Sequence, residues 1–386
     1  MKRRKIVFLT GTRADFGKMK SLIGIVQRAD QFETHIFATG MHMDNKFGLT
    51  VREIEKCGYP NIYKYINHDA GASMDITLSR TIEGFANYIR LIQPDLIVIH
   101  GDRIEALAGA TVGALNNILV AHIEGGELSG TVDELIRHAV SKLSHTHFVA
   151  NDEAKKRLMQ MGERRESIFV IGSPDMDAMK SDALPSIDEV KQYYEIPFDN
   201  YAISMFHPVT TEFDQMDKYA EEYVKALEES GCNFVVIYPN NDSGSDFILS
   251  KIKRLEGNER FRVFPSVRFE SFLSIMEHAQ FIVGNSSAGI REAPFYGVPT
   301  VNVGTRQNGR TRNADIIHTG YGKSDILQGI KKALAVTVKP VSLFGDGKSD
   351  LLFNEIISTE SFWNTATQKT FSDAISAQQY QLDEQY

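Results

Sequence analysis

The sequence predicts an α/β fold made of two Rossmann-like domains with a cleft between them. Three observations predict it. Short apolar runs alternate with helical patterns almost throughout the 386 residues, which is typical of parallel sheets wound by right-handed crossovers. The alternation pauses over residues 181–200, a more polar stretch that carries Pro185 and Pro197. Polar clusters follow the ends of the predicted strands in both halves, where open parallel sheets bind their ligands.

The first half contains six short apolar runs that predict strands. They span residues 6–9, 34–38, 96–100, 118–123, 146–149 and 168–171. Apolar residues at helical spacing lie between them and predict helices, for example over residues 19–28, 104–115 and 153–161. The basic start, residues 1–5, runs directly into the first strand, which is too short for the apolar region of a signal peptide.

Strand-like runs resume at Tyr201 in the second half. They cover residues 201–206, 233–238, 261–264, 281–283, 300–303 and 315–318, with a predicted helix over residues 216–230. We expect an N-terminal domain over residues 1–177 and a C-terminal domain over residues 178–358. A helical segment over residues 359–386 is expected to pack back on the N-terminal domain and to fray at its polar end.

Composition and charge exclude several classes of protein. The hydrophobic and charged contents, 42% and 24%, are those of a globular chain. A net charge of −8 and an isoelectric point near 5.8 give no reason to expect nucleic acid or an anionic membrane as a partner. No run reaches the length of a membrane span. Cys57 and Cys232 lie far apart without a CxxC pair, so we expect no disulfide framework, no zinc site and a cytoplasmic enzyme.

Two common cofactor fingerprints do not occur in the chain. There is no GxxxxGKS motif, and Gly11 and Gly17 do not give a GxGxxG spacing after the first strand. P-loop chemistry and a nicotinamide cofactor are therefore not expected. His145 and His147 alternate along a predicted strand without a convincing third ligand, so we expect structural roles and no metal site. His42, beside two methionines, is expected to pack or to support a loop.

The polar turn from Asn285 to Glu292, which follows the apolar run 281–284, is the most informative segment. Small residues and hydroxyls at a strand-to-helix turn expose backbone N–H groups to an anion. Glu292, one turn into the expected helix, would repel that anion but can accept hydrogen bonds from paired hydroxyls such as a ribose diol. The turn therefore suggests a nucleotide diphosphate. The alternative is an ordinary helix with Ser287 as its N-cap.

Charge is divided between the two sides of the expected cleft. Carboxylates dominate the first-half loops, and basic and hydroxyl groups dominate those of the second half: Asp102, Glu124, Glu127, Asp133 and Glu134 against His207, Ser286, Ser287, Arg291 and Arg306. Arginine and histidine would neutralise a diphosphate. Carboxylates would move protons or stabilise positive charge on a reacting sugar ring. Arg13, in a glycine-flanked loop, could stack on a base or touch a phosphate, or be a solvated loop arginine.

Several motifs occur in a specific order over roughly residues 5–365. They are GTRADFGK (11–18), HGDR (100–103), HIEGGE (122–127), SG (129–130), IRH (136–138), FHPVT (206–210), NSSAGIRE (285–292) and GTRQ (304–307). In this order and spacing they resemble the hydrolysing UDP-N-acetylglucosamine 2-epimerases of bacterial sialic acid biosynthesis. That family has a glycosyltransferase-B fold, in agreement with the two domains predicted above.

The resemblance implies a reaction and its catalytic groups. UDP-N-acetylglucosamine would lose its C2 proton and its UDP to give a 2-acetamidoglucal, and addition of water would give N-acetylmannosamine. Asp102, Glu124 and Asp133 match the catalytic carboxylates of the family, and His207 would act near the diphosphate. No cofactor is implied. We expect a homo-oligomer, either a dimer or a tetramer.

The resemblance also implies nucleotide contacts. Glu292 would bind the ribose, and Arg103 would meet the phosphates or the sugar. Ser286 and Gly289 lie in the turn and Asn240 follows a predicted strand, so we expect them to complete the site. The predicted binding residues are Arg13, Arg103, Asn240, Ser286, Ser287, Gly289, Glu292 and Arg306.

The sequence leaves rival interpretations open. A UDP-2,4-diacetamido-2,4,6-trideoxy sugar of legionaminic acid synthesis is the nearest rival substrate. The pattern at residues 124–130 disfavours a non-hydrolysing epimerase, and a glycosyltransferase would need an acceptor site. A non-catalytic nucleotide-sugar sensor could lose the three carboxylates, which are all present. Also open are Asp133 against Glu134, the carboxylate that takes the C2 proton, feedback regulation and any loosely bound metal ion.

Overall fold

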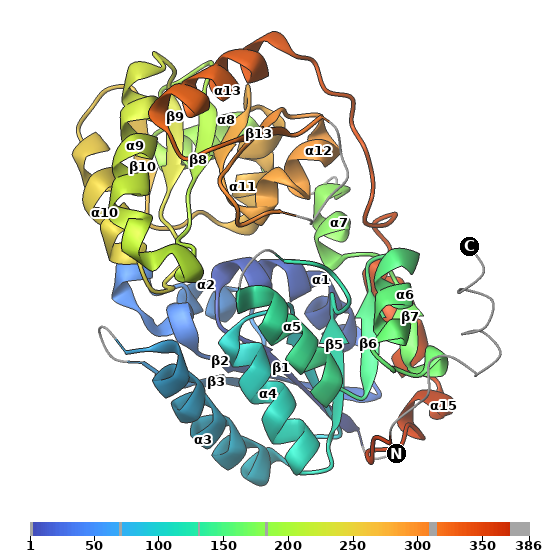
Figure 1. Ribbon diagram of the computed structural model, residues 1–386. Helices are drawn as coiled ribbons and strands as arrows, with labels where there is room; N and C mark the ends of the chain where they lie inside the picture. Colours follow the sequence, from blue (N-terminus) through green and yellow to red (C-terminus); the bar gives the residue numbers. More distant parts are fainter. Residues whose placement is uncertain (1–2, 69–71, 130–131, 182–183, 309–314, 371–386) are drawn as a thin grey trace, which may run out of the picture.

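Two parallel sheets, one from each half of the chain, form the protein (Figure 1). The computed structural model describes residues 3–68, 72–129, 132–181, 184–308 and 315–370. The strand order is β3-β2-β1-β4-β5-β6-β7 in the first sheet and β10-β9-β8-β11-β12-β13 in the second. In each sheet the order reverses beside the first strand of that half, β1 or β8, as in doubly wound folds. The predicted α/β fold with two wound halves is confirmed.

The strands agree closely with the apolar runs. The first sheet contains β1 (Arg4–Thr10), β2 (Phe32–Ala38), β3 (Ile62–Lys64), β4 (Leu96–His100), β5 (Leu119–Ile123), β6 (Thr146–Val149) and β7 (Ile168–Val170). The second contains β8 (Ala202–Met205), β9 (Phe234–Ile237), β10 (Phe261–Phe264), β11 (Ile282–Gly284), β12 (Thr300–Val303) and β13 (Ile317–Thr319).

Helices cover both faces of each sheet (Figure 1). In the first half they are α1 (Arg13–Arg28), α2 (Val51–Lys56), α3 (Met74–Ile92), α4 (Ile104–Leu115), α5 (Val132–Leu143), α6 (Asp152–Gln160) and α7 (Pro174–Met179). They continue with α8 (Ile187–Tyr194), α9 (Met216–Glu229), α10 (Ser245–Ile252), α11 (Phe269–Glu277), α12 (Glu292–Tyr296), α13 (Lys323–Ala335), α14 (Ser349–Ile357) and α15 (Glu360–Trp363).

Alternate residues of the central strands enter different cores. In β1, Ile6 and Phe8 pack with α1 and α14, whereas Val7 and Leu9 pack with α3 and α4. The second sheet repeats this arrangement, with one face of β9 packed on α9 and the other on α11. Strands buried on both faces read as continuous apolar runs, which is why the sequence reveals them. The rigid cores fix the loops at the strand ends.

The chain returns from the second half to the first at its C-terminal end (Figure 1). Phe353 and Ile357 of α14, with Phe362 of α15, lie in the core beside α1. Because α14 precedes residue 359, the return begins before the expected boundary at 358/359. The expected boundaries stay predictions, and the end of the expected tail lies outside the described residues. No helix in the described part of the chain is long and apolar enough to span a bilayer.

Several elements differ from the sequence-based expectation, many of them by one or two residues at their ends. β3 was not predicted, because two of its three residues are exposed and it has no apolar run. α1 begins at Arg13, not at residue 19, because Thr12 and Asp15 form a capping box ahead of the apolar residues. β13 covers Ile317–Thr319, one residue later at its end than expected. The missed strand lies at the edge of its sheet, and the differences in α1 and β13 lie at the ends of these elements.

Candidate active site

A cavity of about 270 Å³ lies between the two halves, at the loops that follow the strands. Ten of the twelve predicted site residues line it: Arg13, Asp102, Arg103, Asp133, His207, Asn240, Ser286, Ser287, Glu292 and Arg306. A second cavity of about 140 Å³ adjoins it and is lined by His100, Glu124, Arg137 and Arg291 as well. We call these the larger and the smaller cavity. Asp102, Asp133, Ser287 and Arg306 line both.

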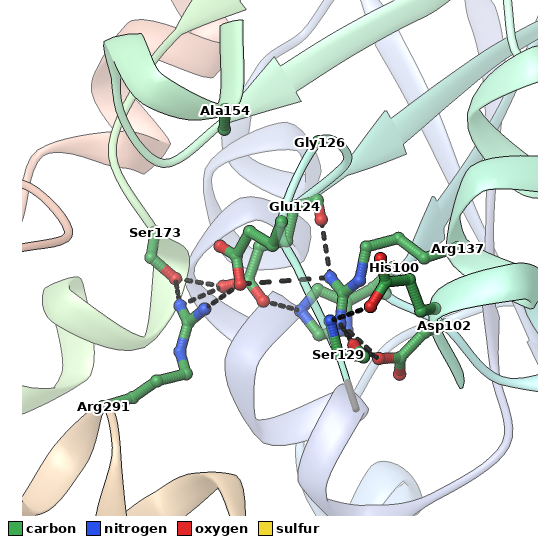
Figure 2. Close-up of polar contacts among 12 residues, drawn as sticks. His100, Asp102, Glu124, Gly126, Ser129, Arg137, Ala154, Ser173 and Arg291 are labelled. Atoms are coloured by element: carbon green, nitrogen blue, oxygen red, sulfur yellow. Dashed lines mark hydrogen bonds and ion pairs between the residues drawn. The ribbon is translucent and has the colours of Figure 1, made fainter. Parts of the chain in front are cut away.

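Glu124 lies in the smaller cavity at the end of β5, where it is almost completely buried. Its Oε1 accepts from Arg291 Nη2 at 2.7 Å and from the Ser173 hydroxyl, and its Oε2 lies 3.1 Å from His100 Nε2 (Figure 2). Burial raises the pKa of Glu124, but Arg291 and His100 outweigh it and hold the pKa well below its ordinary value. The carboxylate is therefore ionised at neutral pH.

The backbone of Glu124 adopts a left-handed conformation with φ of 63°. Such a conformation is uncommon outside glycine and is often found at functional sites. Two hydrogen bonds hold it, because the Glu124 N–H donates to the Phe148 carbonyl at 2.9 Å and Arg137 Nη1 donates to the Glu124 carbonyl at 2.7 Å. Gly126, with φ of 76°, follows, and a side chain there would meet the Ala154 carbonyl oxygen at 2.3 Å.

Asp102 follows β4 and pairs with an arginine of its own half. Arg137 Nη2 donates to Asp102 Oδ2, and the Ser129 hydroxyl donates to the same oxygen at 3.2 Å (Figure 2). Arg137 is buried, and its pKa is raised because Asp102, Glu127 and Glu124 outweigh the effect of burial. Arg137 therefore stays charged and links Asp102 to the loop that carries Glu124.

Asp133, at the start of α5, reaches across to the second half. Its Oδ2 accepts from Arg306 Nη2 at 2.9 Å. The neighbouring Glu134 instead accepts from the Ser129 N–H at 3.2 Å and lies 3.5 Å from His138. Asp133 lines both cavities and Glu134 lines neither of them. The geometry therefore favours Asp133 over Glu134 as the residue that faces the site.

His207 follows β8, and its hydrogen bonds define its protonation. The Asn240 N–H donates to His207 Nδ1 at 3.0 Å, so the neutral ring carries its proton on Nε2. Burial lowers the pKa of His207 well below its ordinary value, and Arg306 and Arg103 lower it further. A neutral imidazole can donate a hydrogen bond from Nε2, but it has no extra proton to give to a leaving group.

Glu292 is buried at the start of α12, beside the larger cavity. Its Oε1 lies 3.4 Å from Lys18 Nζ, and its buried Oε2 has no hydrogen-bond partner within the described residues. Burial lowers the pKa of Lys18, but Glu292 and Asp175 outweigh it and raise the pKa. A buried carboxylate with one unpaired oxygen suits a hydroxyl donor.

The turn before α12 differs in detail from the expectation. Residues Ser287–Gly289, ahead of α12, form a short 3₁₀ helix. The side chain that caps this helix is Ser286, which accepts from the Ala288 N–H at 3.3 Å. Ser287 is therefore not the cap. Gly289 does not line the two cavities, and a side chain added there would meet Thr300 Cγ2 at 2.7 Å. Gly289 packs closely on Thr300 of β12, and its predicted ligand contact stays a prediction.

Two arginines of the first half complete the larger cavity. Arg13 is partly buried, its Nε has no partner within the described residues, and burial lowers its pKa. Arg103 Nη2 donates to Asn241 Oδ1 at 2.8 Å across the cleft, and its Nε donates to Glu105 Oε2 at 3.2 Å. Asn240 also lines the larger cavity, and its backbone N–H donates to His207 Nδ1. The larger cavity is therefore rich in cationic and donor groups.

The histidines expected to be structural do have structural partners. His145 accepts from the Val120 N–H at 3.0 Å and contacts the Thr367 carbonyl at 2.9 Å, whereas His147 lies 3.0 Å from Glu163. His42 contacts the Thr10 and Thr50 hydroxyls, and burial lowers its pKa to about 4. Among the described residues no group of three His, Cys, Asp or Glu side chains could hold a metal ion.

The sequence did not assign several residues that the structure places in the site. Lys18 and Arg137 lie within quoted motifs but received no role. Asp175, on α7, accepts from Arg291 Nε at 3.1 Å and lies 3.1 Å from Lys18, and no motif marks it. Arg291, expected beside a diphosphate, contacts carboxylates instead. A charged residue whose partner comes from the other half leaves no local signal in the sequence.

The architecture is that of a two-domain α/β protein with a glycosyltransferase-B-like fold, with paired carboxylates and arginines at its interdomain cavity. The sequence model of the UDP-N-acetylglucosamine 2-epimerase family matches residues 25–358, and the chain belongs to that family.

Named relatives and a solved structure resemble the chain over most of its length. A Neisseria meningitidis protein named UDP-N-acetylglucosamine 2-epimerase is 50% identical over 96% of this chain and 99% of its own. A Legionella pneumophila protein named UDP-N,N'-diacetylbacillosamine 2-epimerase (hydrolyzing) is 34% identical, with coverage of 92% and 96%. The Escherichia coli polysialic acid biosynthesis protein P7 is 32% identical, with 85% of both chains covered. The Methanocaldococcus jannaschii UDP-GlcNAc 2-epimerase, solved with UDP-GlcNAc and UDP, matches with a TM-score of 0.76 at 20% identity, covering 92% of this chain and 99% of that one.

Proposed function

We propose that the protein is a hydrolysing UDP-N-acetylglucosamine 2-epimerase that converts UDP-N-acetylglucosamine and water to UDP and N-acetylmannosamine, the first step of sialic acid synthesis. One observation carries the proposal: a cavity rich in cationic and donor groups adjoins a smaller one that holds Asp102, Glu124 and Asp133. The 50% identical Neisseria relative bears the name of this epimerase, and the Escherichia coli relative is named for polysialic acid biosynthesis.

The larger cavity would hold the UDP group. Its contacts would come from both halves, with the unpaired Oε2 of Glu292 accepting from the ribose. Ser287 and Arg306 would bind the phosphates, and His207 would donate to them from Nε2. In this arrangement the sugar would extend into the smaller cavity, because Ser287 and Arg306 line both.

The reaction needs help because the C2 proton is not adjacent to a carbonyl group. Departure of UDP builds positive charge on C1 and the ring oxygen, and ionised carboxylates stabilise that charge. One carboxylate takes the C2 proton, and the C1–O bond breaks with its electron pair leaving on UDP, which gives the 2-acetamidoglucal. Water then adds across the C1–C2 double bond, with its proton delivered to the opposite face of C2. Asp102, Glu124 and Asp133 would share these proton transfers.

The hydrolysing mode and the sugar are the finer parts of the proposal. The Legionella relative carries the word hydrolyzing in its name, which supports the same mode here. That relative also favours a second candidate, a hydrolysing epimerase that acts on a UDP-2,4-diacetamido-2,4,6-trideoxy sugar. The higher identity to the Neisseria protein ranks UDP-N-acetylglucosamine first.

The test compares the two sugars directly. Purified protein is mixed with UDP-N-acetylglucosamine or with the diacetamido analogue, without added NAD, and UDP release is followed in each case. The proposal predicts faster release, by kcat/KM, from UDP-N-acetylglucosamine. Release from the analogue alone assigns the second candidate, and release from neither contradicts a hydrolysing enzyme for these sugars.

A further inference from the structure

Each of the three carboxylates at the site pairs with an arginine. Asp102 pairs with Arg137, and Glu124 pairs with Arg291. Asp133 pairs with Arg306, whose Nη2 lies 2.9 Å from Asp133 Oδ2. The three pairs look alike in chemistry, but their arginines differ in position and in how many other groups hold them.

Arg137 and Arg291 are both held by several groups. Arg291 contacts three carboxylates: Glu124, Glu127 and Asp175. Arg137 contacts Asp102 and also donates to the Glu124 carbonyl. Both arginines are buried, and neither lines the larger cavity. They belong to the framework of the smaller cavity.

Arg306 has fewer contacts than the other two arginines, and it lines the larger cavity. Within the described residues its ion pair is with Asp133, and its other contact is a 3.3 Å hydrogen bond to the Asn285 carbonyl. Its side chain lines the larger cavity beside Ser286 and Ser287. Arg306 is thus the arginine of the three that a nucleotide's phosphates can reach.

The pair lies where the two cavities adjoin. Asp133 comes from α5 of the first half, and Arg306 comes from the loop after β12 of the second half. Both residues line both cavities, and so does Ser287. A nucleotide sugar that spans the cavities would have its diphosphate at this junction.

We propose that Asp133 and the diphosphate of the substrate compete for Arg306, and that substrate binding transfers Arg306 from Asp133 to the diphosphate. This inference rests on the proposed function. A diphosphate carries more charge than one carboxylate and also accepts a bidentate arginine. Asp133 then loses a cation, and its affinity for a proton rises as the sugar arrives beside it. After UDP departs, Arg306 returns to Asp133. The exchange makes Asp133 more basic when substrate is bound than when the site is empty, while Arg103 continues to act electrostatically on it.

The test measures UDP affinity by calorimetry for the wild type and matched variants. Asp133→Asn removes the competitor, so UDP should bind about tenfold tighter, the order expected for one charge-assisted contact. Asp133→Ala should also tighten UDP binding. Agreement between the two variants excludes an effect of misfolding in one of them or of a new hydrogen bond from the asparagine amide. Asp102→Asn removes a carboxylate that pairs with Arg137, and it should leave UDP affinity within about twofold. Asp246→Asn removes an exposed ion pair with Lys46 of the other half and should also have no effect.

A double-mutant cycle separates exchange from simple repulsion. Arg306→Gln should weaken UDP binding, and adding Asp133→Asn should then give no tightening. Two results would overturn the exchange, because each would mean that loss of negative charge alone tightens UDP binding. The first is that Asp133→Asn tightens UDP binding equally with and without Arg306. The second is that Asp102→Asn tightens UDP binding as much as Asp133→Asn does. Unchanged affinity in Asp133→Asn also overturns the exchange while leaving the proposed function intact. A wild-type protein that does not bind UDP overturns the proposed function and the exchange together.

Discussion

Arg291 Nη2 lies 2.7 Å from Glu124 Oε1, which joins the turn before α12 in the second half to the end of β5 in the first. The guanidinium also contacts Glu127 and Asp175, and it is almost completely buried. Its neighbour in the sequence, Glu292, lines the larger cavity. The position and charge of Glu124 therefore depend on the half of the protein that we propose binds the nucleotide.

Replacing Arg291 should impair turnover more than UDP binding. Arg291→Lys keeps the charge but loses the planar fork, so we expect a fall in kcat of about 10²-fold with UDP affinity changed by less than about threefold. Because Arg291 lowers the pKa of Glu124, the acid limb of the kcat profile should move to higher pH in the variant. Arg254→Lys, in an exposed pair with Glu221, is the matched control and should leave both constants unchanged. An unshifted acid limb would contradict the role given to Arg291.

The three carboxylates should be required for turnover but not for folding. Asp102→Asn, Glu124→Gln and Asp133→Asn each keep the shape of the side chain, so they should fold and bind UDP while losing about 10²–10⁴-fold in kcat. Circular dichroism and UDP titration check the first two points. Loss of the proton-abstracting residue should also abolish exchange of the C2 proton with deuterated water. Near-normal turnover in one variant removes that residue from the catalytic set.

Glu292 should act in binding, not in chemistry. A ribose contact serves the ground state and the transition state about equally, so Glu292→Ala should raise KM by roughly tenfold or more with little change in kcat. Steady-state kinetics over a range of substrate concentrations measure both constants. Glu277→Ala, an exposed glutamate on α11, is the control. A large fall in kcat at constant KM would place Glu292 among the catalytic groups instead.

Glu163 should stabilise the fold in a pH-dependent way, far from the site. It lies 3.0 Å from His147, 2.8 Å from Lys142 and 2.6 Å from Lys369, and although burial opposes it these partners lower its pKa to about 2. Because the pKa of Glu163 is lower in the folded protein than its unfolded value of about 4.3, the ionised carboxylate stabilises the fold at pH values above about 4.3. This stabilisation is lost as the pH falls towards about 2.

Glu163→Gln should therefore destabilise the protein at pH 7 by about 2 kcal/mol, with a difference that shrinks below pH 4.3. Denaturant unfolding at a series of pH values measures this. Exposed Glu166→Gln is the control and should change little. A destabilisation that does not vary with pH would show that packing, and not charge, explains the effect.

The fold could be predicted because its strands are buried on both faces. The runs that became β4, β5 and β11 are apolar apart from His100 and His122, and they locate the loops that carry Asp102, Glu124 and Ser287. The exposed strand β3 has no such run and was missed. Burial on two faces is a local property of the chain, whereas an edge strand is defined by its neighbour.

The cavity residues could also be named, but their pairing could not. Asp133 and Arg306 are separated by most of a domain in sequence, and their contact depends on how the two halves meet. Arg291 was expected beside a diphosphate because arginine commonly binds phosphate, but three buried carboxylates surround it. A sequence shows which charges follow the strands and does not show which opposite charges will face them.

The identity of the products tests the central claim most directly. The protein is incubated with UDP-N-acetylglucosamine in deuterated water, and the products are identified by proton NMR. The account predicts UDP together with N-acetylmannosamine that carries deuterium at C2, since the C2 proton is removed and replaced from solvent. UDP-N-acetylmannosamine that keeps its nucleotide, or a product that retains the original C2 proton, would contradict it.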